Sequence, residues 1–203
     1  MVIMIFYPHL QSPIIKMIAI DPGSHNTGVA RFDVKPRERE ILSIKAWSIN
    51  VDKLKNDTGL PEELYSEKFI RFYKLRNQLV RIFNEENATF IAYEGPFMNR
   101  FQPSAYGPLV ALQTLIHDSI VTYNPGVPFF VLQPQQAKKA VGVAGKKGKG
   151  VIKEAVKTNG DLMKGLTGGL CLLDELDEHS IDAIAVGFCA LKLKLFKKDK
   201  LYV

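Results

Sequence analysis

The chain has 203 residues, 46% of them hydrophobic and 24% charged, and its 27 Lys and Arg residues outnumber its 21 Asp and Glu residues. This length suits one domain with a buried core, and the composition excludes wholesale disorder. The formal net charge of +6 favours an anionic partner, although charge alone does not identify one.

The N-terminal stretch of residues 1–16 is apolar, but Pro8 and Pro13 interrupt it and no basic segment precedes it. It resembles neither a signal peptide nor a membrane-spanning helix, so we expect no membrane partner. We interpret it as an N-terminal extension or arm, followed by a single domain over residues 17–203. Two cysteines are too few for a disulfide framework. Their small number favours a reducing intracellular compartment. Since no other run approaches transmembrane length, we expect a soluble protein, cytoplasmic or nucleoid-associated, with the host cytoplasm (for a viral protein) and an organelle as open alternatives.

The domain is predicted to open with three strands. The apolar stretches are MIAID at 17–21, GVARFDV at 28–34 and ILSIKAWSI at 41–49. The first ends on a carboxylate and enters a turn that contains glycines, among them Gly28, and the charged turn KPRERE follows the second. Short strands separated by turn residues predict an antiparallel meander.

The rest of the domain alternates helices with strands. An amphipathic helix is predicted within residues 60–87 from apolar residues at steps of three and four, with Pro61 near its start: Leu64, Phe69, Phe72, Leu79, Ile82 and Phe83. A strand at TFIAYEG, a helix from Ser104 to Tyr123 capped by Ser104, a strand at VPFFVLQP and a mostly helical remainder follow. This order is that of an RNase H-like α/β sheet, with three antiparallel strands and then parallel strands flanked by helices. Periodicity alone establishes only the α/β class.

Four side chains could perform chemistry: Asp21, Glu94, His179 and Asp182. Asp21 and Glu94 each end a predicted strand, where ligands and catalytic groups gather in such sheets. His179 and Asp182 are three residues apart and share one face of a predicted helix. Taken singly, each has a simpler explanation as a turn former, a strand-end residue or a surface polar residue. Together they form a set that two divalent ions could use.

Three motifs resemble the acidic motifs of the RuvC Holliday-junction resolvases, in order: IAIDPGSHNTGVA, YEGPFM and HSIDAIA. The resemblance covers about residues 17–193. It implies an RNase H-like nuclease domain that binds two Mg²⁺ (or Mn²⁺) ions per active site, uses no nucleotide cofactor and, as a homodimer, makes paired nicks across a four-way DNA junction. It also implies that Asp21, Glu94 and Asp182 are metal ligands. His179 then becomes the fourth catalytic group, either a ligand or a group that positions the water and the scissile phosphate.

A lysine-rich segment and a short motif after Glu94 are candidates for DNA contact. The residues are Lys138, Lys139, Lys146, Lys147, Lys149 and Lys153 in the segment, with Phe97 and Arg100 in EGPFMNRF. Lysines can neutralise phosphates, and the resemblance implies that an aromatic at position 97 stacks on bases near the branch point. A solvated charge run and a buried Phe97 are the ordinary alternatives.

Other functions remain open at this stage. The first motif also resembles the phosphate loop of the sugar-kinase and actin-like ATPases, which need two lobes. A related nuclease could act on RNA, as proposed for YqgF-like proteins, or on other branched DNA. A DNA-binding protein without catalytic activity is a further possibility.

Overall fold

The structure is a computed structural model of the chain, and it describes residues 13–57, 59–61, 63–97, 104, 106–146, 148, 150–167 and 169–196. Arg100, Lys147 and Lys149 lie outside the described residues. The strands are β1 (Ile15–Asp21), β2 (Asn26–Lys35), β3 (Glu40–Asn50), β4 (Phe90–Glu94) and β5 (Phe129–Leu132). The α-helices are α1 (Glu67–Glu85), α2 (Tyr106–Tyr123), α3 (Pro134–Ala140), α4 (Val151–Thr158), α5 (Gly160–Gly165), α6 (Gly169–Glu175) and α7 (Glu178–Ala190). A short 3-10 helix, η2 (Val51–Lys53), and a short π-helix, η4 (Leu191–Leu195), accompany them.

The strands form one mixed sheet of five strands in the order β3-β2-β1-β4-β5. β1, β2 and β3 pair antiparallel, which confirms the predicted meander. β4 then pairs parallel with β1, and β5 pairs parallel with β4. The predicted α/β architecture of three antiparallel strands followed by parallel strands is therefore confirmed.

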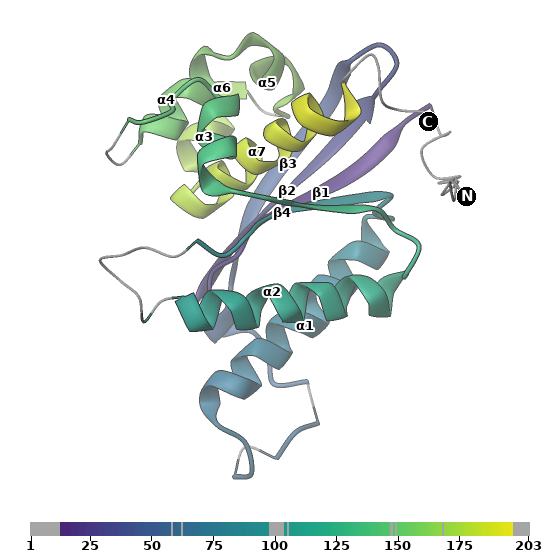
Figure 1. Cartoon of the computed structure of the whole chain (residues 1–203), viewed down its shortest axis with the longest axis vertical. Coiled ribbons are helices and arrows are strands. Elements are labelled where there is room, and N and C mark those ends of the chain that lie inside the picture. The colour runs from purple at the N-terminus through teal and green to yellow at the C-terminus, as the bar shows by residue number, and fades with distance from the viewer. Residues whose placement is uncertain are drawn as a thin grey trace, which may run out of the picture.

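Helices cover both faces of this sheet (Figure 1). α1 and α2 pack on one face around Leu75, Leu79 and Ile116. α7 lies against the other face, with α3 to α6 around it. α7 sits close to the strands because Gly187 has no side chain. A Cβ atom there would lie 2.1 Å from Cε2 of Phe32 in β2.

Two helices begin later than the sequence predicts. α1 starts at Glu67, and the Oγ atom of Ser66 accepts a hydrogen bond from the Phe69 backbone N–H at 3.3 Å. Ser66, a good N-cap residue, rather than Pro61 therefore fixes the start. Leu64 precedes the helix and is 76% exposed, and Phe69 is 45% exposed, so neither belongs to the core. These side chains are exposed because the N-terminal half of α1 extends beyond the sheet (Figure 1). α2 starts at Tyr106 and ends at Tyr123 as predicted.

Within the described residues, none of the helices combines the length and the apolar character needed to cross a membrane.

Candidate active site

The two strand-end carboxylates lie at the same edge of the sheet. β1 and β4 are neighbouring parallel strands, with Ile20 opposite Tyr93, so their carboxyl ends meet. Asp21 is the last residue of β1 and Glu94 is the last residue of β4. The side chain of Asp21 is only 14% exposed. Buried apolar strands thus end in carboxylates that the sheet holds in partly buried positions.

The turn that follows Asp21 is closed by Thr27. The Thr27 hydroxyl donates to the Gly23 carbonyl at 2.8 Å, and it accepts from the Gly23 N–H at 3.4 Å. Thr27 is almost fully buried, so this pair of bonds is sheltered from water. The turn is also tied to the chain after β3, because the Val51 N–H donates to the His25 carbonyl at 2.8 Å. These bonds fix the direction in which β1 presents Asp21.

The first turn of α7 brings the remaining two candidates to this edge. Asp177 is the N-cap residue, and its Oδ1 atom accepts from the Ser180 N–H at 2.8 Å and from the Ser180 hydroxyl at 2.6 Å. Such a cap fixes where the helix begins. His179 and Asp182 follow on one face of α7, which packs against β1 and β2. Asp177 is a positioning residue in the acidic stretch DELDE, which offered only a general helix-start signal.

Gly28 permits the close approach of α7. It lies within β2, opposite Asp21, which agrees with the predicted strand at 28–34 and shows that the turn after Asp21 ends before this glycine. A Cβ atom at position 28 would lie 1.9 Å from the carbonyl oxygen of His179. The glycine is needed because backbone of α7 occupies the space of a side chain. It therefore sets how closely the first turn of α7 approaches β2 beside Asp21.

His179 and Asp21 form a hydrogen-bonded pair, with 3.0 Å between Nδ1 of His179 and Oδ2 of Asp21. This bond is the main reason that the pKa of His179 lies above its ordinary value, and burial opposes it. The charges of Asp21, Asp177 and Asp182 raise the pKa further. The imidazole therefore favours its charged form beside these carboxylates.

The other two carboxyl groups favour their neutral forms. Burial is the largest cause for both, and it raises the pKa of Glu94 to about 8 and that of Asp182 to about 7. Asp21 adds negative charge next to each of them, and Asp182 also raises the pKa of Glu94. Lys138 acts in the opposite direction on both. The three acids are thus electrostatically coupled across two strands and a helix.

This donor set fits a divalent cation. Hard cations prefer several carboxylate oxygens from separate elements, and a bound cation relieves repulsion among them. Among the described residues, no three His, Cys, Asp or Glu side chains are arranged in this structure so that they could bind one metal ion together. Asp21 directs one oxygen to His179 instead. Side-chain rotation would therefore have to complete the site.

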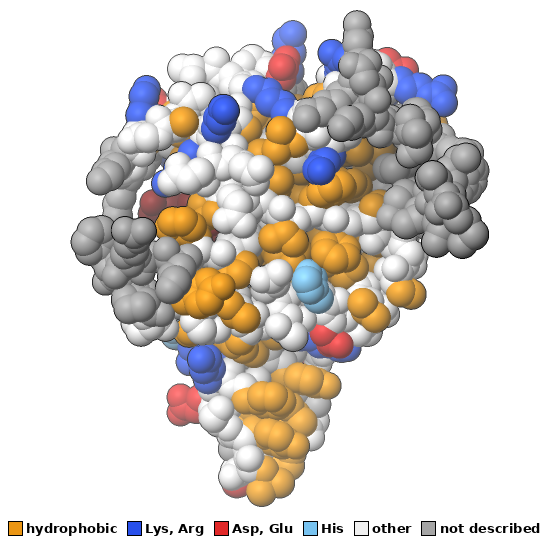
Figure 2. Space-filling view, in the orientation of Figure 1, with side chains coloured by type: hydrophobic (Ala, Val, Ile, Leu, Met, Phe, Trp, Pro, Cys, Tyr) orange, Lys and Arg blue, Asp and Glu red, His pale blue; other side chains and the backbone are white. Residues whose placement is uncertain are grey.

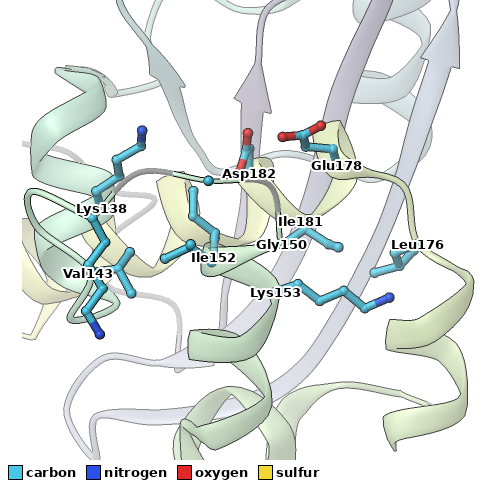
Figure 3. A pocket seen from close by; sticks show the side chains of 12 residues that line it. Lys138, Val143, Gly150, Ile152, Lys153, Leu176, Glu178, Ile181 and Asp182 are labelled. Carbon is cyan, nitrogen blue, oxygen red and sulfur yellow. The ribbon is translucent and has the colours of Figure 1, made fainter.

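A basic pocket of about 210 Å³ adjoins the carboxylates (Figure 3). Lys138, Lys146 and Lys153 line it together with Glu178 and Asp182. In Figure 3 the side chains of Lys138, Glu178 and Asp182 project toward the same side, whereas Lys153 points away toward Leu176. The ammonium of Lys153 lies 3.2 Å from Oδ1 of Asp174, so part of its role is to hold α4 against α6.

The remaining candidates for DNA contact are scattered. Lys139 is exposed on α3, and Lys146 is exposed in the loop before α4. Phe97 lies just after β4 and is 51% exposed, which argues against the alternative of a core side chain. The described part of the motif thus places an accessible aromatic ring three residues beyond Glu94.

The sheet order and the helices on its two faces define an RNase H-like α/β fold. Solved structures similar to this chain include several Holliday junction resolvases. RuvC of Thermus thermophilus in complex with a Holliday junction substrate matches with a TM-score of 0.59 and 18% identity, over 88% of this chain and 94% of that one. The yeast mitochondrial Holliday junction resolvase Ydc2 matches with a TM-score of 0.61 and 16% identity, over 91% of this chain and 82% of that one.

The Fowlpox virus resolvase, solved with its Holliday junction DNA, gives a TM-score of 0.50 at 10% identity, over 88% of this chain and 97% of that one. No family model and no curated relative matches the sequence. At these identities the likeness establishes the fold, and it confirms the RNase H-like architecture expected from the order of the elements.

Proposed function

We propose that this protein is a metal-dependent, structure-selective endonuclease that resolves four-way DNA junctions, a crossover junction endodeoxyribonuclease. The observation that carries the proposal is the coupled set of Asp21, Glu94 and Asp182 at one sheet edge, with a basic pocket beside it. Structural neighbours that are Holliday junction resolvases support the choice of substrate.

In this proposal Asp21, Glu94 and Asp182 hold two Mg²⁺ (or Mn²⁺) ions. Bound metal would activate the attacking water and stabilise the leaving oxygen of the phosphodiester. The residues of the chain supply position and charge. β1 and β4 fix two carboxylates, while the cap of α7 fixes Asp182 and His179. His179, held by its bond to Asp21, is placed to orient the scissile phosphate in its protonated form or to act as a further ligand in its neutral form.

DNA binding is assigned to the basic segment and to Phe97. Lys138, Lys139, Lys146 and Lys153 belong to the described part of this segment. The charge of Lys138 reaches both Glu94 and Asp182, so a phosphate neutralised by Lys138 would lie beside the carboxylates. Phe97 is placed to stack on a base near the branch point, which an exposed ring allows.

A homodimer is part of the proposal, because two nicks across one junction need two sites. Its support is a broad apolar face, on which hydrophobic side chains gather over the N-terminal half of α1 and along α2 (Figure 2). The exposed residues are Leu64, Tyr65, Phe69 and Tyr73 on or before α1, Tyr106, Val110 and Val121 on α2, and Phe129 and Val131 on β5. Large exposed apolar patches mark interaction surfaces. Sedimentation equilibrium of wild type and of Val121→Glu would test this assignment.

The deciding experiment is cleavage of a labelled four-way junction with Mg²⁺ or EDTA, using wild type and Asp21→Asn. Symmetric paired nicks that need metal and vanish in the variant are expected. RNA or flap substrates cleaved in preference to the junction would favour the related nucleases. Tight Mg²⁺-dependent ATP binding in calorimetry would favour the ATPase lobe. Junction binding without any cleavage would favour a DNA-binding protein that has no catalytic activity.

A further inference from the structure

A second basic hollow lies away from the carboxylates, between the chain that follows β3 and the middle of α1. Its volume is about 390 Å³. The lining residues are Lys53, Leu54, Lys55, Asp57, Lys74, Asn77, Gln78 and Arg81. Four of these side chains are cationic and one is anionic, and the two amides can bond to phosphate oxygens or to base edges. The lining therefore suits an anionic ligand with several oxygens.

The cations of this hollow are largely uncommitted in the described part of the chain. No ion pair within 4.0 Å joins Lys53, Lys55 or Lys74 to a described carboxylate, and Arg81 reaches Glu85 only at 3.8 Å. Lys153 and Lys157, in contrast, each have such a partner, in Asp174 at 3.2 and 3.0 Å. Unpaired lysines around a hollow repel one another, and an anion in the hollow would remove that repulsion.

The hollow lies on the same side of the molecule as the end of β1. β3 runs in the same direction as β1, because each of them is antiparallel to β2, so β3 also ends at the carboxylate edge. Lys53 comes three residues after Asn50, the last residue of β3. A strand of DNA that passes the carboxylates could thus continue toward Lys53.

A chain of polar contacts ties the turn after Asp21 to this hollow. Nδ1 of His25 lies 2.8 Å from Oδ2 of Asp52, and Nε of Arg71 lies 2.9 Å from the other carboxylate oxygen of Asp52. The pKa of Asp52 is lowered first by its bond to His25, then by the charge of Arg71, and in part by that of Lys74. His25 belongs to the turn that begins at Asp21, while Asp52 adjoins Lys53. These contacts hold η2 and α1 in place against the turn that follows Asp21.

We infer that Lys53, Lys55 and Lys74 form a second phosphate-binding site for DNA, on the α1 side of the sheet. The site receives a stretch of backbone that continues from the scissile phosphate over the β1–β2 turn. The basic segment around Lys138 and Lys146 lies on the α7 side of the sheet. The two sites would therefore contact DNA from both faces of the sheet. This inference rests on the proposed action on DNA.

The test is a triple variant, Lys53→Gln, Lys55→Gln and Lys74→Gln, measured in EDTA by fluorescence anisotropy with a labelled four-way junction at several salt concentrations. A second triple variant with the same change in net charge is the matched control. It carries Lys35→Gln, Lys45→Gln and Lys164→Gln, at positions that do not line either basic pocket.

The expected result is an affinity at least about tenfold weaker in the first variant. Its plot of log affinity against log salt should have a slope smaller by about 2 to 3, since each phosphate contact contributes about 0.9. The control should keep the slope of wild type. Equal behaviour of the two variants would overturn the inference, because net charge alone would then explain any loss.

Two further arms separate this inference from the proposed function. Wild-type protein that binds junction DNA but does not cut it with Mg²⁺ would contradict the proposed nuclease activity. The comparison of salt slopes would still test the second phosphate-binding site. Protein that binds no DNA at all would overturn both. Calorimetry with inorganic pyrophosphate is the last arm. Pyrophosphate binding that the triple variant abolishes, with DNA binding unchanged, would identify a small-anion site and would overturn the DNA assignment.

Discussion

Nδ1 of His179 lies 3.0 Å from Oδ2 of Asp21, although the two residues are 158 positions apart in the sequence. The bond joins the end of the first strand to the first turn of the last long helix. It keeps the imidazole close to a carboxylate that could bind metal and raises the pKa of His179. The pair is therefore the physical link between the two ends of the candidate site.

Replacing His179 should slow cleavage without weakening junction binding. We expect His179→Gln to lower kcat at least about tenfold, because the imidazole beside Asp21 is lost. Junction affinity in EDTA should stay within about twofold of wild type, since the DNA contacts lie elsewhere. Single-turnover kinetics over pH 5–9 would measure the effect. A variant with the same kcat as wild type across that range would exclude a role in the reaction.

The stability of the metal-free protein should fall as the pH rises from 5 to 8. Glu94 goes from an ordinary pKa of 4.5 to about 8 on folding, and Asp182 goes from 3.8 to about 7. The folded protein therefore binds more protons than the unfolded chain in this window, and rising pH removes that stabilisation. His179, whose pKa is also raised, acts in the same direction, since its pairing is lost as pH rises through the folded pKa. Thermal unfolding in EDTA at a series of pH values would measure the trend.

Glu94→Gln isolates one contribution to that trend. At pH 8 the neutral amide should stabilise the metal-free protein by about 1–2 kcal/mol, which corresponds to a rise of roughly 2–8 °C in Tm. At pH 5 the variant and wild type should unfold at nearly the same temperature. A variant that is less stable than wild type at pH 8 would show that the ionised Glu94 carboxylate does not destabilise the folded protein.

Metal should stabilise the protein through the carboxylates. Mn²⁺ or Mg²⁺ is expected to raise Tm at pH 8 in a concentration-dependent manner, because a ligand that binds only the folded state adds its binding free energy. Asp182→Asn should reduce this shift strongly, and it should cut less than about 1% of the junction that wild type cuts. Equal shifts in the two proteins would place the metal elsewhere.

Phe97→Ala should weaken binding of branched DNA. Loss of one base stack is expected to cost about 1–3 kcal/mol, or roughly 5–150-fold in Kd. Phe97→Trp should retain most of the affinity, because it keeps an aromatic face. Anisotropy with junction and linear duplex would show whether the loss is greater for the junction. An unchanged Kd in the alanine variant would leave the exposed ring without this function.

Gly28→Ala should damage both the fold and the site. The added Cβ meets the His179 carbonyl oxygen at 1.9 Å, so α7 must move away from β2. We expect the variant to lose about 2 kcal/mol or more of stability and most of its cleavage activity. Denaturant unfolding and junction cleavage would measure these losses. Gly126→Ala is a control in a loop, where a Cβ meets nothing closer than 3.3 Å.

Much of the fold could be predicted from local pattern. The alternation of apolar runs and turn residues over residues 17–49 placed three strands, and the change to steps of three and four placed α1. Both signals are local, because side chains alternate across a strand and recur every three or four residues on a helix. The prediction that α1 starts near Pro61 was wrong. Leu64 and Phe69 fit the helical period, but both side chains are exposed because this part of the chain lies beyond the sheet.

The residue types of the site can be predicted from local sequence pattern. Asp21 and Glu94 end apolar strands, and the spacing of His179 and Asp182 puts them on one helical face, so the sequence alone predicts which side chains could perform chemistry. Their arrangement in space depends on the tertiary structure. The parallel pairing of β1 with β4, the missing side chain at Gly28 and the cap at Asp177 bring residues distant in the chain to one edge. Burial and mutual repulsion there set the pKa values of Glu94 and Asp182, because both depend on what surrounds a group in space rather than on its neighbours along the chain.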